Sequence, residues 1–88
     1  MTVHGIKCKK CGAQIYSRAR HDFRWCPCEA VAIDGGVDYT KVTGNPEDFE
    51  MVTLKLFDDW SDEVVLRNLF EDWNRGENRF GIIKPEDQ

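Results

Sequence analysis

The sequence predicts a small α+β domain, with an antiparallel β part at residues 3–43 and one C-terminal amphipathic helix at residues 60–75. Two observations lead to this fold class. In the first half, short segments that alternate between apolar and polar residues are separated by turn residues. In the second half, apolar residues recur at helical spacing. Because 88 residues amount to one domain, we expect residues 1–88 to fold as a single unit, with residues 3–43 and 44–88 as its two parts.

The β part is expected to consist of short strands separated by tight turns. The expected strands are residues 3–7, 13–17, 22–25, 29–34 and 37–43. Before the last of these, Asp34-Gly35-Gly36 predicts a hairpin turn, because glycine accepts the positive φ angle that such a turn requires. Acidic residues in this segment disfavour phosphate binding, and a calcium loop needs more oxygen ligands at regular spacing. A hairpin turn is therefore the favoured interpretation.

The second half is expected to begin with a helical turn and a strand. Pro46 followed by acidic residues suits one short helical turn at residues 46–50. Residues 51–57 alternate in polarity and predict a strand that extends or flanks the β part. In the tail, Phe80, Ile82 and Ile83 indicate either a final edge strand or a flexible docking segment.

The helix at residues 60–75 is predicted by one apolar stripe. The stripe consists of Val65, Leu66, Leu69, Phe70 and Trp73. The solvent-facing side is expected to carry Glu63, Arg67, Asn68, Glu71, Asp72 and Arg75. Residues 58–62 offer N-cap candidates, and Gly76 stands where a glycine commonly ends a helix. We expect Val65, Leu69 and Trp73 of this stripe to pack onto the sheet, and Phe70 to belong to the core as well.

Four cysteines form the strongest functional pattern in the chain. They are Cys8, Cys11, Cys26 and Cys28, arranged as Cys-x-x-Cys-Gly and Cys-x-Cys. Each pair can present two thiolates from one tight turn, and the glycine after the first pair accepts the backbone angle of that turn. The segment between the pairs is long enough for two strands and a turn that bring them together. We therefore predict one structural zinc ion bound by four thiolates, a saturated site without an open position for substrate.

Other uses of these cysteines are less favoured. Two disulfides would require an oxidising compartment, but the N-terminal residues show no apolar signal region. No apolar run approaches the roughly 18 residues of a membrane span. We therefore expect a cytoplasmic location without membrane partners. An iron–sulfur cluster would use the same thiolates, whereas a redox pair at Cys8 and Cys11 lacks a βαβ context. His21 is a candidate ligand if Cys26 or Cys28 were out of reach, and otherwise a hydrogen-bond donor near the site.

The first half resembles a set of small, uncharacterised, zinc-ribbon-like proteins of phages and bacteria. The resemblance covers about residues 6–43 and is carried by Cys-Lys-Lys-Cys-Gly at 8–12, Arg-His-Asp-Phe at 20–23, Cys-Pro-Cys at 26–28 and Asp-Gly-Gly-Val-Asp-Tyr at 34–39. It implies a zinc-ribbon-like fold, a metal-binding scaffold and a phage origin, and hence the cytosol of a bacterial host, but no activity. Glu29 departs from the pattern, which has glycine there, so the second turn is expected to be less regular and the metal site more exposed.

The charges are distributed unevenly and suggest a first function. Residues 1–43 carry seven basic and four acidic side chains, whereas residues 44–88 carry five basic and twelve acidic ones. Tryptophan and phenylalanine are frequent interface anchors, so Trp60 and Phe80, which lie outside the main helical stripe, are candidate partner-binding residues. The first hypothesis is a protein-interaction module, in particular a phage protein that binds and inhibits a host or defence protein.

The alternative hypothesis is a nucleic-acid-binding zinc ribbon that uses the basic segment at residues 7–25. Its candidate contacts are Lys9, Lys10, Arg18, Arg20 and Arg24. Aromatic residues interleaved with these cations could stack on bases, but the net charge of −4 and the acidic second half would repel a polyanion. No enzyme is expected, because beyond the dipeptide His21-Asp22 the chain has no catalytic residue set, phosphate-binding glycine loop or open metal site.

Overall fold

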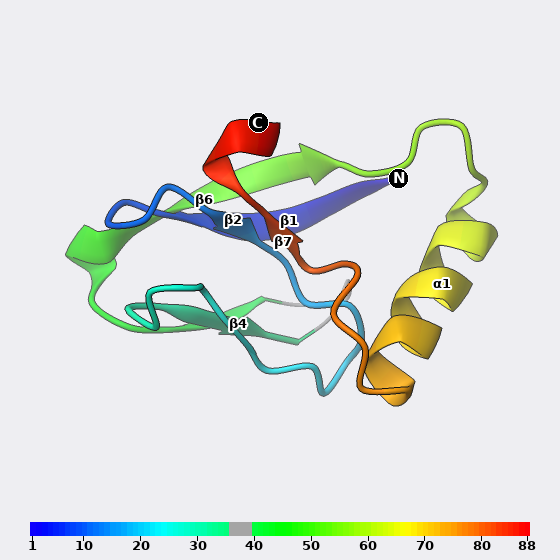
Figure 1. Ribbon diagram of the computed structural model, residues 1–88, viewed down its shortest axis with the longest axis horizontal. Helices are drawn as coiled ribbons and strands as arrows, with labels where there is room; N and C mark the ends of the chain where they lie inside the picture. The colour runs from blue at the N-terminus through cyan, green and yellow to red at the C-terminus, as the bar shows by residue number, and fades with distance from the viewer. Residues whose placement is uncertain (36–39) are drawn as a thin grey trace.

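Two antiparallel sheets and one α-helix make up the computed structural model, which describes residues 1–35 and 40–88 (Figure 1). The larger sheet has the strand order β6-β1-β2-β7, formed by β1 (Thr2–Cys8), β2 (Gln14–Ile15), β6 (Phe49–Lys55) and β7 (Ile82–Ile83). The smaller sheet has the order β3-β4-β5, formed by β3 (Arg24–Trp25), β4 (Ala32–Asp34) and β5 (Lys41–Thr43). The predicted α+β class is confirmed. The expected Gly35-Gly36 turn and the first residues of the expected strand 37–43 fall partly outside the described residues.

Strand β1 joins the two halves of the chain. It pairs with β6 along its whole length, from Thr2 opposite Lys55 to Cys8 opposite Phe49. The strand expected at 51–57 thus begins two residues earlier, directly after the 3₁₀ turn η1 (Pro46–Asp48), and becomes an edge strand beside β1. At the other edge β7 pairs with β2, so the tail contains the edge strand that was one of its two predicted forms, followed by a 3₁₀ turn η2 (Pro85–Asp87).

The helix α1 (Asp62–Asn74) begins and ends at the residues that its capping chemistry requires. Ser61 is the N-cap, and its side chain accepts a hydrogen bond from the backbone N–H of Val64. At the C-terminus, the N–H of Gly76 donates to Trp73 O at 3.0 Å and the N–H of Glu77 donates to Asp72 O at 2.9 Å. This pair of bonds, with Gly76 at φ +71°, is a Schellman motif, and it confirms Gly76 as the residue that ends the helix. The described residues include no helix with the length and apolarity needed to span a bilayer.

The buried apolar residues form two clusters. In Figure 1 the two sheets lie one above the other, and α1 stands at one end of them. The cluster beneath α1 consists of Val3, Tyr16, Leu54, Leu56, Val65 and Leu69. The cluster between the two sheets consists of Ile6, Cys8, Ile15, Cys26, Val31 and Ile33. The second cluster includes Cys8 and Cys26, so two of the four predicted metal ligands are part of the hydrophobic core.

The side of α1 that faces the core differs from the predicted stripe. Val65, Leu69 and Asp72 are fully buried, at spacing i, i+4 and i+7. Leu66 and Phe70 lie on the adjacent side of the helix and remain 38% and 51% exposed. The prediction that Asp72 faces solvent is therefore wrong, and so is the prediction that Phe70 belongs to the core. The apolar stripe is wider than the surface that α1 buries. The sequence pattern therefore does not determine which side of the stripe faces the core.

The buried carboxylate of Asp72 connects three segments of the chain. It accepts hydrogen bonds from Arg18 Nη1 at 2.6 Å, from the N–H of Arg79 at 3.2 Å and from the N–H of Phe80 at 3.1 Å. Arg18 is itself buried and also donates to Asp22 at 2.7 Å. Burial by itself would raise the pKa of Asp72, but the hydrogen bonds from Arg18, Phe80 and Arg79 outweigh it and the pKa is lowered. Asp72 is therefore ionised and is the counter-ion of a buried guanidinium.

We expect Asp72→Asn to lower the free energy of unfolding by about 3 kcal/mol, because it leaves part of the charge of Arg18 buried without a counter-ion. Glu71→Gln, one residue away on the same helix, should change it by less than about 0.5 kcal/mol. Urea unfolding of the two variants and the wild type measures both effects. Equal losses in both variants would contradict the role of Asp72.

The same variant has a defined pH dependence. Because the pKa of Asp72 is lower in the folded than in the unfolded chain, its contribution to stability is complete above its ordinary value, near pH 4, and is lost as the pH falls through the folded pKa. The difference in unfolding free energy between wild type and Asp72→Asn should therefore be constant at neutral pH and narrow below about pH 4.

Candidate metal centre

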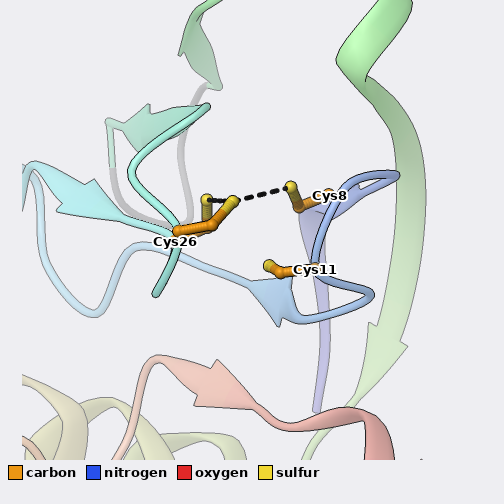
Figure 2. A group of neighbouring side chains, drawn as sticks. Cys8, Cys11 and Cys26 are labelled. Carbon is orange, nitrogen blue, oxygen red and sulfur yellow. Dashed lines mark hydrogen bonds between the residues drawn. The ribbon is translucent and has the colours of Figure 1, made fainter.

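The four cysteine sulfurs converge at one point between the two sheets. Cys8 ends β1 and Cys11 lies in the turn that follows, whereas Cys26 directly follows β3 and Cys28 lies two residues further on. The four Sγ atoms all lie within 4.8 Å of one another. The Sγ of Cys28 is 3.5 Å from that of Cys8 and 3.3 Å from that of Cys26. Figure 2 shows Cys8 and Cys11 on one turn pointing toward Cys26 on the other.

This arrangement fits a tetrahedral metal ion. With metal–sulfur bonds of about 2.3 Å, a tetrahedral tetrathiolate site has sulfur–sulfur distances of about 3.8 Å, which fall between the shortest and longest separations seen here. All four cysteines are free thiols, and the observed distances are well beyond the roughly 2.05 Å of a disulfide bond. Among the described residues the cluster does not include His21, so four cysteines bring together a complete ligand set.

Backbone hydrogen bonds close both cysteine turns in the same way. The N–H of Cys8 donates to Ala13 O at 2.9 Å, and the N–H of Cys26 donates to Val31 O at 3.0 Å, so that each turn is closed five residues after its first cysteine. The second turn is closed like the first although it carries one residue fewer between its cysteines. Two turns of common design thus face one another and aim their thiols at one point.

Glycine and glutamate occupy equivalent backbone positions after the two pairs. Gly12 has φ +79° and Glu29 has φ +61°, both in the left-handed region. Their N–H groups donate to Cys8 O at 2.8 Å and to Cys26 O at 2.9 Å. The prediction that Gly12 accepts an unusual backbone angle is confirmed. The substitution of the expected glycine by Glu29 leaves the turn intact but places a residue with a Cβ in a conformation that costs about 1–2 kcal/mol.

The cluster is enclosed on one side and open on the other. Cys8 and Cys26 are fully buried in the core, Cys11 is half-buried and Cys28 is exposed. A hydrogen bond from the N–H of Ala30 lowers the pKa of the Cys28 thiol, but the neighbouring sulfurs, Cys26 foremost, and partial desolvation outweigh this and raise it to about 12. The cause is the crowding of four sulfurs, which disfavours thiolate charge unless a cation is present. Four converging sulfurs are a donor set that zinc and other thiophilic ions take.

The candidate nucleic-acid contacts are divided between surface and interior. Lys9, Lys10 and Arg20 are exposed, and Lys10 lies 3.6 Å from Asp48. Arg18 is buried in its ion pairs with Asp22 and Asp72. Arg24 is buried as well and donates to Asn78 Oδ1 at 2.8 Å and to the backbone oxygen of Phe80. The two buried arginines hold the tail against the first half and do not belong to a basic surface. Sequence patterning missed this role, because arginine is expected at the surface.

The two candidate partner-binding residues lie on either side of Phe57. The ring of Trp60 stacks on that of Phe57, with centroids 4.9 Å apart, and Trp60 is 40% exposed. The ring of Phe80 meets Phe57 edge-on at 5.2 Å and packs half-buried against the cluster beneath α1. Trp60 is therefore available to a partner, whereas Phe80 contributes mainly to packing.

Comparison with known proteins finds one family. Residues 1–44, half of the chain, match the model of a family described as a domain of unknown function (DUF7695). No curated protein and no solved structure gives a significant match. The matched residues contain both cysteine turns and end just beyond β5.

We expect Glu29→Gly to raise the free energy of unfolding by about 0.5–1 kcal/mol, because the relief of left-handed strain exceeds the greater entropy loss of glycine on folding. Glu29→Ala is the matched control: it removes the same side chain and keeps the strain, so its stability should stay near wild type. Thermal and urea unfolding of the metal-loaded proteins compare the three. A gain in both variants would attribute the effect to the glutamate side chain rather than to the backbone.

Proposed function

The chain belongs to this family of unknown function, and we propose that it is a protein-interaction module whose fold is stabilised by one structural zinc ion. Cys8, Cys11, Cys26 and Cys28 would bind the ion. When bound, zinc supplies a cross-link between the two cysteine turns and takes no part in a reaction, because four thiolates fill its coordination sphere. The observation that carries the metal part of the proposal is the convergence of four free sulfurs within 4.8 Å. We also propose that the protein is not an enzyme, because a zinc ion bound by four thiolates has no open position for a substrate or a reactive water.

Zinc is the favoured ion because of its ligand preferences. Thiolates select zinc, copper(I) and iron–sulfur clusters, and a single tetrahedral site of four cysteines is typical of structural zinc. A ribbon-like arrangement, with two cysteine turns at the ends of short hairpins, also suits this ion.

Large apolar side chains on the surface support the interaction part of the proposal. The exposed ones include Phe23, Trp25, Met51, Trp60 and Phe70, with exposed fractions from 40% to 56%. An 88-residue chain that leaves this many large apolar groups uncovered has surface to bury against a partner. The resemblance to small phage proteins makes a host enzyme or defence component the class of partner that we propose to test first.

One observation favours nucleic acid as a second candidate. Phe23, directly before β3, and Trp25, in β3, are both exposed, and their rings meet edge-on with centroids 5.6 Å apart. Base stacking uses such exposed aromatic side chains. Against it, only Lys9, Lys10 and Arg20 of the five proposed basic contacts are exposed. Protein binding is therefore the better supported function.

We expect the purified protein to contain about one equivalent of zinc, and we expect removal of the ion by a chelator to unfold it. Structural zinc contributes about 10 kcal/mol or more, comparable with the whole stability of a small domain, about 5–15 kcal/mol. Metal analysis and circular dichroism measure both effects.

Cys8→Ser, at a buried ligand, should abolish folding at 37 °C, whereas Cys28→Ser, at the exposed ligand, should weaken zinc retention and leave the fold detectable. Less than half an equivalent of zinc with fully reactive thiols would refute the zinc site.

A tagged pull-down from a bacterial lysate, with and without nuclease and followed by mass spectrometry, tests the interaction. We expect a stoichiometric protein that survives nuclease treatment. Trp60→Ala should reduce its capture while lowering stability by less than about 1 kcal/mol, whereas Phe80→Ala should cost about 2 kcal/mol or more through lost packing. Recovery of nucleic acid, with accompanying proteins lost on nuclease treatment, would favour the second candidate.

A further inference from the structure

A groove runs between the loop that follows β2 and the helix α1. It encloses about 270 Å³. Arg18, Ala19, Arg20 and His21 line one wall, and Leu66, Phe70 and Trp73 line the other. The groove is separate from the cysteine cluster and from the aromatic group around Phe57, so neither the metal centre nor the predicted partner-binding residues account for it.

The helical wall of the groove is apolar and exposed. Phe70 and Leu66 are 51% and 38% exposed, while Val65 and Leu69 are the apolar residues by which α1 joins the core on its neighbouring side. The rings of Phe70 and Trp73 lie against each other, with centroids 5.7 Å apart. The described part of this chain therefore leaves an apolar surface on α1 that its own fold does not cover.

The loop wall is fixed in place and cationic at its rim. At its base, Arg18 is held by Asp22 and Asp72, which neutralise its charge. At the rim, Arg20 and His21 are exposed, and within residues 1–35 and 40–88 Arg20 makes no ion pair. Elsewhere on α1 the cation of Arg67 is already paired with Glu63 at 3.6 Å. The unpaired charge at the mouth of the groove is therefore positive.

We propose that this groove binds a short peptide segment of a partner protein, in which one large apolar side chain is flanked by aspartate or glutamate. The inference rests on the proposed function and specifies its partner. The apolar side chain would lie between Phe70 and Ala19, and the flanking carboxylates would face Arg20. A volume of about 270 Å³ lies below the roughly 300–1,000 Å³ of small-molecule sites and suits one or two side chains.

Charge complementarity favours an acidic peptide over other occupants. A nucleic acid strand needs several cations along its track. Of the two arginines that line this groove, Arg18 is neutralised by Asp22 and Asp72, and only Arg20 has no carboxylate partner among the described residues. A second copy of this chain would offer Trp60, preceded by Asp58 and Asp59 and followed two residues later by Asp62, which has the proposed chemistry. Self-association through that segment is therefore a distinct outcome that the experiment must detect.

The test is an NMR titration of the full, metal-loaded, ¹⁵N-labelled chain with two capped peptides. The probe is Asp-Asp-Leu-Asp-Asp and its control is Lys-Lys-Leu-Lys-Lys. We expect the acidic probe to shift the amides of residues 19–21, 66, 70 and 73, with a dissociation constant of about 1 mM or below that weakens with salt. The basic control should bind at least tenfold more weakly. No shift at about 5 mM probe, equal binding of both peptides, or shifts confined to other surfaces would overturn the proposal.

Two variants separate this site from a merely structural role. Arg20→Glu should weaken the acidic probe at least tenfold and improve binding of the basic control, because the charge at the rim is reversed. Phe70→Ala should weaken both peptides while its melting temperature stays near wild type, since Phe70 is half exposed. Shifts that depend on protein concentration without peptide, and that vanish in Trp60→Ala, would assign the groove to a second copy and overturn the proposal.

The pull-down distinguishes failure of this inference from failure of the proposed function. A partner that is captured equally well by wild type, Arg20→Glu and Phe70→Ala would leave the interaction module standing and remove the groove as its site. Capture of no protein by the wild type would remove the function itself, and a negative NMR titration would then remove the groove independently.

Discussion

A single buried charge pair, Arg18 with Asp72, holds the helix α1 against the loop that follows β2. Arg18 belongs to the half that matches the family model, and Asp72 to the half that does not. Because Asp72 also accepts the N–H groups of Arg79 and Phe80, the loop after β2, the helix α1 and the tail all meet at one carboxylate. The buried guanidinium needs this counter-ion, since an unpaired buried charge is among the costliest defects a small domain can have. The position of α1 beside the sheets, and hence both walls of its groove, depends on this contact.

Local chemistry made much of the fold predictable. Ser61 begins the helix by accepting a backbone N–H on its hydroxyl oxygen, and Gly76 ends it through backbone hydrogen bonds. Both involve only neighbouring residues, so composition near each end was sufficient. The cysteine cluster was predictable because two tight turns with the right spacing can reach a common ion. The burial of Asp72 and the exposure of Phe70 were not, because both depend on where a distant arginine meets the helix. Asp72 does lie seven residues after Val65, on the core-facing side, and this spacing was the one available signal for it.

The metal ligands and the hydrophobic core are parts of one structure. Cys8 and Cys26 pack among Ile6, Ile15 and Val31 between the sheets, so an ion bound there would sit against the apolar cluster that joins them. The smaller sheet contributes only short strands and gains little from its own hydrogen bonds. The attachment of the smaller sheet to the larger one therefore depends on this shared cluster.

The order of the ligands along the chain has a consequence for the folding pathway. Cys8 and Cys28 are 20 residues apart, whereas the pairing of β1 with β6 closes loops of about 40 to 50 residues. Each doubling of loop length raises the entropic free-energy cost of closing the loop by about 0.6 kcal/mol. The two cysteine turns can therefore meet early, while the longest strand pair of the protein must wait for a distant segment. During synthesis, a nascent chain with only its first half outside the ribosome would already hold all four thiols, and metal capture could precede the arrival of β6 and α1.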